Sequence, residues 1–221
     1  DKVREEVEDK TPKRGFAHED RVIAQLESEF APMGHIVEAV GNVPGDAGSK
    51  KGDGLITLAP RPNNNAEVRV VVEAKARKLT IRQTLDEARE AIHNRGAQAA
   101  IFVFDSQETA PTSVPIHIHD NVFIAVYDGE DSSALKAAFF SAQLKALTAA
   151  DTISVDQINV ERVETLLAET RQQLARVASI KAHHTASINA IEKAGDVASA
   201  IQTEVSGLVD ELSTEFTVGS E

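Results

Sequence analysis

Two apolar segments of this chain carry charged residues at positions where chemistry could take place. Asp53 opens the apolar run of KKGDGLITL (50–58), and Glu73 and Lys75 lie inside VVVEAKARK (70–78). A buried strand rarely carries charges without a partner or a task. Side chains alternate along a strand, so Glu73 and Lys75 project from one face. If the two runs pair as a hairpin, Asp53 joins them at one edge of a sheet.

Two carboxylates beside an ammonium group favour the binding of a hard divalent cation. Magnesium takes one or two carboxylates, keeps several waters and binds phosphate oxygens. Lys75 could then orient the attacking water, help to deprotonate it, and stabilise charge that develops on phosphorus. Structural roles are the alternative. Asp53 could favour the glycine-rich turn, and Glu73 with Lys75 could be an ion pair on a solvated face.

Hydrophobic spacing and turn residues predict an α/β fold around a central mixed sheet. The first helix begins at Thr11 and Pro12 and ends before Pro32 and Gly34. A later helix spans 79–95, with Thr80 as a possible N-cap and Gly96 placed to end it. The expected strands are 35–41, then 54–60 and 67–76 as antiparallel neighbours joined by RPNNNA (61–66), then 97–104 buried on both faces, and one or two strands within 114–128.

After residue 130 the sequence predicts helices only. A helix over 135–149 is followed by a break at TAADTISVDQ (148–157) and a long helical tail. The tail has a coiled-coil-like seam with a phase slip near Gly195, where the helix could break, so a helical hairpin and a homodimer arm are both open. The seam residues are Val163, Leu167, Thr170, Leu174, Val177, Lys181, His184, Ile188 and Ile191, then Ala198, Ile201, Val205, Leu208 and Leu212. We therefore expect a charged segment over 1–12, an α/β domain over 13–130 and a helical tail over 131–221.

Composition narrows the class of protein. The net charge is −12, which argues against coating nucleic acid by bulk attraction. The absence of cysteine excludes disulfides and thiolate chemistry, and no run is long enough for a membrane span, so we expect a soluble, cytoplasmic protein that does not bind membranes. The charged opening DKVREEVEDK suggests a piece of a longer protein.

The pattern of these residues resembles the PD-(D/E)XK phosphodiesterase superfamily, the restriction-endonuclease-like fold. Gly52-Asp53 and Glu73-Ala74-Lys75 match its two motif segments, with glycine in place of the proline, and Glu19 matches a first-helix glutamate found in many members. The order of elements agrees over about residues 13–128. The resemblance implies Mg²⁺- or Mn²⁺-dependent nuclease activity, with the metal held by Asp53, Glu73, the Ala74 carbonyl and Glu19, and with Lys75 positioning the nucleophile.

Nucleic acid, most simply DNA, is the expected partner. Basic residues near the carboxylates suit a phosphate backbone, although they could equally be ordinary solubilising surface. In the resemblance, Gln83 corresponds to a glutamine that some members carry after the lysine. The candidate nucleic-acid-binding residues are Lys50, Lys51, Arg77, Lys78, Arg82 and Gln83, with Lys13 and Arg14 as further basic residues.

Two other readings remain open. The domain could be a catalytically inactive nuclease-like module that assembles as a homo-oligomer or larger complex through its tail, or a scaffold in which the helices dominate. His117 and His119 share a strand face, as zinc ligands can, but the sequence supplies no third ligand.

Overall fold

The computed structural model describes residues 12–60, 67–150 and 159–218. It divides into two compact units, one up to Ala175 and one from Arg176. The predicted strand connection over 61–66, the Thr11 cap and most of the predicted break over 148–157 lie outside the described residues. The elements in chain order are α2 (Pro12–Phe30), η1 (Ala31–Met33), β1 (Ile36–Ala39), β2 (Gly54–Thr57), β3 (Arg69–Lys75), α3 (Ile81–Arg95), β4 (Ala99–Phe104), β5 (Ile116–His119), β6 (Val122–Val126), α4 (Ser133–Ala149) and α5 (Val160–Val218).

The strands form one six-stranded mixed sheet in the order β1-β2-β3-β4-β6-β5. The pairs β1–β2, β2–β3 and β5–β6 are antiparallel, whereas β3–β4 and β4–β6 are parallel. Every residue of β4 is buried, as its unbroken apolar run predicts for a strand covered on both faces. The α/β class with a central mixed sheet is confirmed, while membership of the restriction-endonuclease-like fold remains a prediction.

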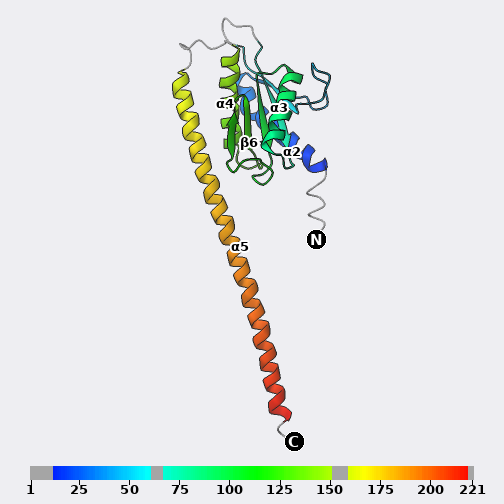
Figure 1. The fold of residues 1–221 in the computed structure, drawn as a ribbon, viewed down its shortest axis with the longest axis vertical. Helices are drawn as coiled ribbons and strands as arrows, with labels where there is room; N and C mark the ends of the chain where they lie inside the picture. Colours follow the sequence, from blue (N-terminus) through cyan, green and yellow to red (C-terminus); the bar gives the residue numbers. More distant parts are fainter. Residues whose placement is uncertain (1–11, 61–66, 151–158, 219–221) are drawn as a thin grey trace. The chain divides into compact units, whose positions relative to one another are not determined.

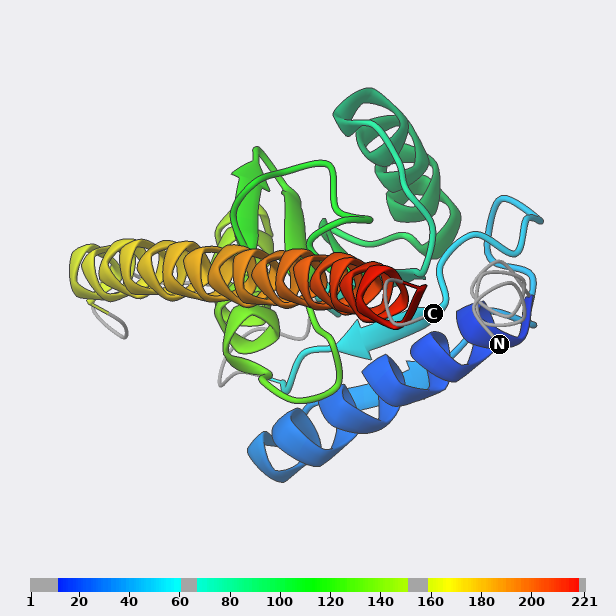
Figure 2. The same cartoon turned by 90° about the horizontal axis from the view of Figure 1, so that it is seen from below.

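Helices cover both faces of the sheet. One core combines α2 and α4 with the face of β3 that carries Val70 and Val72, and the other combines α3 with the opposite face, which carries Val71. Figure 2 shows α2 and α3 on opposite sides of the strands. This three-layer packing buries the residues of β3 from Val70 to Glu73, and Lys75 lies where the strand leaves the core.

Local signals explain where α3 begins and ends. Thr80 and Gln83 form a reciprocal capping box, in which the Thr80 side chain accepts from the Gln83 N–H and the Gln83 side chain accepts from the Thr80 N–H. Gly96 ends the helix in the left-handed conformation, with φ of 57°. Both ends agree with the sequence prediction.

Helix α4 is part of the α/β unit. Leu135, Ala138, Phe139 and Ala142 are buried in the same core as α2, and the Phe139 ring stacks on Phe30 at 3.7 Å between centroids. This compact unit thus extends to Ala175, beyond the residue 130 at which the sequence pattern of strands stops. The apolar residues of this alanine-rich helix need that cover, while Lys136 and Lys145 on its partly exposed side pair with Glu29 and Asp120.

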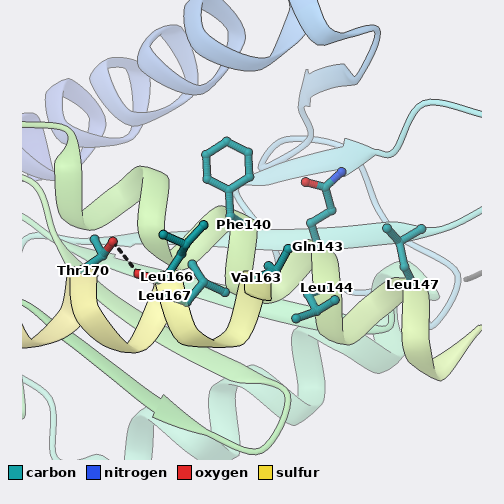
Figure 3. A pocket seen from close by; sticks show the side chains of 8 residues that line it. All are labelled: Phe140, Gln143, Leu144, Leu147, Val163, Leu166, Leu167 and Thr170. Carbon is teal, nitrogen blue, oxygen red and sulfur yellow. Dashed lines mark hydrogen bonds between the residues drawn. The ribbon is translucent and has the colours of Figure 1, made fainter. Parts of the chain in front are cut away.

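The first part of α5 also belongs to this unit. Val163, Leu166, Leu167 and Thr170 line an apolar hollow of about 370 Å³ together with four α4 residues (Figure 3), and Leu174 packs against the core. The α4 residues are Phe140, Gln143, Leu144 and Leu147. The first residues of the predicted seam thus contact their own unit.

Helix α5 spans Val160–Val218 and therefore continues through Gly195; Figure 1 shows it as a single helix. The predicted break at Gly195, and with it a hairpin at that position, is wrong. A single glycine costs a helix only about 1 kcal/mol relative to alanine, too little to end a helix of this length. No helix among the described residues is long and apolar enough to cross a membrane.

Candidate functional site

Asp53 and Glu73 lie where the ladder between β2 and β3 ends. Its last pair is Gly54 with Val72, and the Asp53 N–H also donates to the Val72 carbonyl at 2.9 Å. Asp53 precedes that pair in β2 and Glu73 follows it in β3, so both carboxylates lie at the same edge of the sheet. Glu73 projects from the same face as Val71, which packs in the core on the α3 side.

Each carboxylate accepts a main-chain N–H from the segment that carries the other. Asp53 Oδ2 accepts from the Ala74 N–H at 2.8 Å, and Glu73 Oε1 accepts from the Gly52 N–H at 2.6 Å. Glu73 is only 3% exposed. A buried carboxylate is tolerated only when its oxygens are hydrogen-bonded or paired, so this exchange fixes the position of both side chains.

Lys75 lies between two glutamates. Its Nζ donates to Glu73 Oε2, lies 3.5 Å from Glu87 Oε2, and sits 5.8 Å above the Phe102 ring. Glu87 in turn pairs with Arg77 at 2.9 Å. The site therefore contains a third glutamate, supplied by α3.

Glu87 was missed by the sequence prediction, although a signal for it exists. It follows the buried Thr84 by three residues and precedes the buried Ala91 by four, so it shares the inward face of α3. A carboxylate on the buried stripe of a helix needs a cationic partner. The lysine and arginine at the end of the preceding strand are that partner.

Glu19 approaches the site from α2 across Gly41. A Cβ added to Gly41 would lie 2.8 Å from Glu19 Oε1 and 3.6 Å from Asp53 Oδ1, so the missing side chain leaves space between the two carboxylates. Within the described part of the chain, no hydrogen bond or ion pair is assigned to Glu19 or to Asp53 Oδ1. The predicted set of Glu19, Asp53, Glu73 and Lys75 is thus brought together.

Burial and the neighbouring negative charges raise the pKa of Asp53 and of Glu19. Burial raises the pKa of Asp53 from 3.8 to about 7, with repulsion from Glu73 adding to it and Lys75 opposing it. Burial also raises the pKa of Glu19, with further contributions from Asp20 and Glu73. Burial alone would lower the pKa of Lys75, but the carboxylates around it outweigh burial and raise it. Lys75 therefore stays protonated.

The loop that leads to Asp53 is held by the end of α3. Arg95, only 5% exposed, donates from Nε to the Lys51 carbonyl at 2.8 Å, and from a terminal nitrogen to the carbonyls of Val40, Val43 and Gly52 at 2.7, 2.9 and 3.1 Å. Asn94 adds bonds from its side chain to the carbonyls of Ser49 and Lys51 at 2.9 and 2.8 Å. Neither residue was predicted, because their partners lie more than 40 residues away in the chain.

Gly52 adopts a conformation that the family's proline could not. Its φ is +93°, and an added Cβ would lie 2.7 Å from Val71 Cγ2. Proline fixes φ near −65° and has no N–H, whereas here the Gly52 N–H holds Glu73. The glycine that stands in place of the motif's proline thus has a local structural reason.

The predicted nucleic-acid-binding residues differ in what they contact. Arg77 pairs with Glu87 and Lys51 with Glu90, while Arg82 lies 3.8 Å from Asp86. Gln83 caps α3. Lys50 and Lys78 are exposed, and the side chains of Lys13 and Arg14 lie outside the described residues.

The carboxylates of the site meet the ligand requirements of a hard cation only in part. Residues 12–60, 67–150 and 159–218 contain no group of three His, Cys, Asp or Glu side chains placed to hold a metal, which also leaves His117 and His119 without a third ligand. Magnesium, however, needs only one or two carboxylates and retains water. The space beside Gly41, between the Glu19 carboxylate and Asp53 Oδ1, is where a cation would relieve the repulsion that raises the pKa of Asp53.

Comparison of the chain with family models, with curated proteins and with solved structures finds no match. The resemblance to the PD-(D/E)XK superfamily therefore depends on Glu19, Asp53, Glu73 and Lys75 and on the order of the elements around them.

Proposed function

We propose that the protein is a divalent-metal-dependent nuclease that hydrolyses phosphodiester bonds, with DNA as its substrate. The observation that carries this function is the meeting of Asp53 and Glu73, each of which accepts a main-chain N–H from the other's segment, at one sheet edge with Lys75 and Glu19. Two close carboxylates, one with a pKa that burial and repulsion from the other raise to about 7, are typical of a cation site, and such perturbed groups cluster at functional sites.

The residues would have two roles, metal binding and positioning of the nucleophile. Asp53, Glu73, the Ala74 carbonyl and Glu19 would hold Mg²⁺ or Mn²⁺. A bound cation of this kind polarises a phosphoryl oxygen and lowers the pKa of a bound water. Lys75 remains protonated, so it orients the nucleophile and stabilises negative charge as a cation rather than accepting a proton.

Basic side chains near the site favour a phosphate substrate despite the net charge of −12 of the whole chain. Lys50, Lys78 and Arg82 are exposed on segments adjoining the site, and Arg77 is exposed although it is paired with Glu87. Cationic side chains around a metal site attract the phosphate backbone and position it without reading its sequence.

The test is Mg²⁺ and Mn²⁺ titration calorimetry combined with plasmid nicking on the same samples. We compare the wild type with Asp53→Asn, Glu73→Gln and Lys75→Met, and with Glu27→Gln as a charge-removal control exposed on α2. The expected result is that the Asp53 and Glu73 variants lose binding and nicking, that Lys75→Met loses nicking while it still binds metal, and that Glu27→Gln keeps both. Nicking that survives in Asp53→Asn would refute this assignment.

A second candidate function is a catalytically silent nuclease-like module that binds nucleic acid or assembles with partners. It is favoured by the ion pair between Glu73 and Lys75, which satisfies both charges without a metal. In this case the wild type would bind neither cation, even with DNA present, and a gel-shift assay would still detect DNA binding that falls when Lys50 and Lys78 are replaced.

A further inference from the structure

The second unit, from Arg176 onward, exposes a row of large apolar side chains. Seven side chains that are between 45% and 71% exposed lie along one face: Val177, Ile180, Ile191, Ile201, Val205, Leu208 and Leu212. Ile188, Val197 and Val209 are exposed beside that face. Aliphatic side chains repeated along one helix face are the pattern of a surface that is covered by another helix.

These side chains follow an unbroken heptad repeat. From Val177 to Leu212 the steps are strictly three and four residues, which gives six a positions and five d positions without the phase slip that the seam in the sequence analysis required. The a positions are Val177, His184, Ile191, Ala198, Val205 and Leu212, and the d positions are Ile180, Ser187, Ala194, Ile201 and Leu208. An unbroken 3–4 repeat of this length favours a left-handed coiled coil.

The charged residues beside this row are basic at its start and acidic at its end. Arg176 and Lys181 flank its first part, whereas Glu204 and Glu211 flank its last part. In the heptad, Arg176, Glu204 and Glu211 occupy g positions and Lys181 an e position. A parallel pair would bring Arg176 of one copy beside Lys181 of the other, because g contacts the next e in that arrangement. Like charges would then meet.

We propose that the unit from Arg176 associates with a second copy of the same chain as an antiparallel coiled coil centred between Glu192 and Lys193. In that register Val177 packs on Leu208 of the second copy, and Ile180 on Val205. Each d residue faces an a residue, and the g positions face each other, so Arg176 lies beside Glu211 of the second copy. Charge complementarity thus selects both the occupant of the surface and its direction.

The size of the side chains agrees with this arrangement. The two-fold axis brings the centres of both helices together, and the central layers pair Ile191 with Ala194 and Ser187 with Ala198 of the second copy. A large residue facing a small one fills the interface evenly, and small residues let the helices approach closely. None of the catalytic candidates contributes to this surface, so it stands whether or not the nuclease function does.

The chain has no cysteine, so spin labels can be attached at single introduced sites in the full chain. Ala182→Cys and Asn189→Cys both lie on the outer f positions. In the antiparallel register the two labels of a dimer are offset along the axis by about 32 Å for position 182 and by about 11 Å for position 189, at about 1.5 Å per residue. Dipolar electron resonance is therefore expected to give a longer distance at 182 than at 189. Equal distances, or no dipolar coupling, would overturn the proposal.

A charge swap gives a second readout. In the antiparallel dimer, Arg176→Glu faces Glu211 and should raise the dimer dissociation constant roughly tenfold, and adding Glu211→Arg should restore it. In a parallel dimer the same Arg176→Glu would attract Lys181 and tighten association. Lys193→Glu, on an outer c position, is the control because it changes the net charge by the same amount as Arg176→Glu. Sedimentation equilibrium measures all four chains, and tighter association of Arg176→Glu would refute the antiparallel direction.

Discussion

Replacing Asp53 with asparagine should stabilise the protein at neutral and alkaline pH in the absence of metal. The side chain keeps its shape and an oxygen that can accept the Ala74 N–H, but it removes a charge that burial and Glu73 disfavour. A carboxylate of raised pKa contributes no instability below its unfolded value of 3.8. Its cost grows as the pH rises to about 7 and is complete above that.

The magnitude follows from the size of the shift. A rise from 3.8 to about 7 spans about three pKa units, and each unit corresponds to about 1.4 kcal/mol, so the variant should gain up to about 4 kcal/mol in free energy of unfolding at pH 8. At pH 4 the gain should vanish. Urea unfolding followed by circular dichroism at pH 4, 6 and 8 with EDTA measures this difference, with Glu27→Gln as the control.

Saturating Mg²⁺ should reverse the comparison. A cation that binds the native wild type stabilises it by mass action, whereas Asp53→Asn has lost the charge that attracts the cation. If the variant is no more stable than the wild type at pH 8 in EDTA, then the Asp53 carboxylate is not destabilised by its surroundings, and the reasoning from charge repulsion fails.

Three further substitutions test the supports of the site by the same unfolding assay. Gly52→Pro should destabilise the protein by about 3 kcal/mol or more, because proline cannot adopt φ of +93° and removes the N–H that holds Glu73. Arg95→Met should cost about 3 kcal/mol and weaken Mg²⁺ binding, since four loop carbonyls lose a charged donor. Gly15→Ala should instead stabilise by about 0.5–1 kcal/mol, because an added Cβ meets nothing within 4 Å on helix α2. Wild-type stability in the first two, or a loss in the third, would contradict these accounts.

Different contacts hold Asp53 and Glu73 in position. Asp53 depends on a loop that is held from the far end of α3, and Glu73 depends on the N–H of the residue before Asp53. Changes at Arg95 should therefore act on metal affinity and not on the ability of Lys75 to stabilise charge. Metal titration and nicking at saturating metal separate the two effects.

Local pattern in the sequence determined the elements and the nominal site. The apolar run of β4, the capping residues Thr80 and Gly96, and the alternation that sets Glu73 and Lys75 on one face each depend on neighbours within a few residues, where periodicity and backbone preference act. Antiparallel pairing of two adjacent strands then followed, and with it the meeting of Asp53 and Glu73.

Tertiary structure decided what no local pattern encodes. Arg95 and Asn94 bind main-chain carbonyls 43 to 55 residues away, and any residue could supply a carbonyl, so the sequence has no signal for that partner. The same holds for α4, whose burial depends on a sheet face left open by α2. Periodicity specifies which face of an element is apolar, and only the packed chain specifies what that face meets.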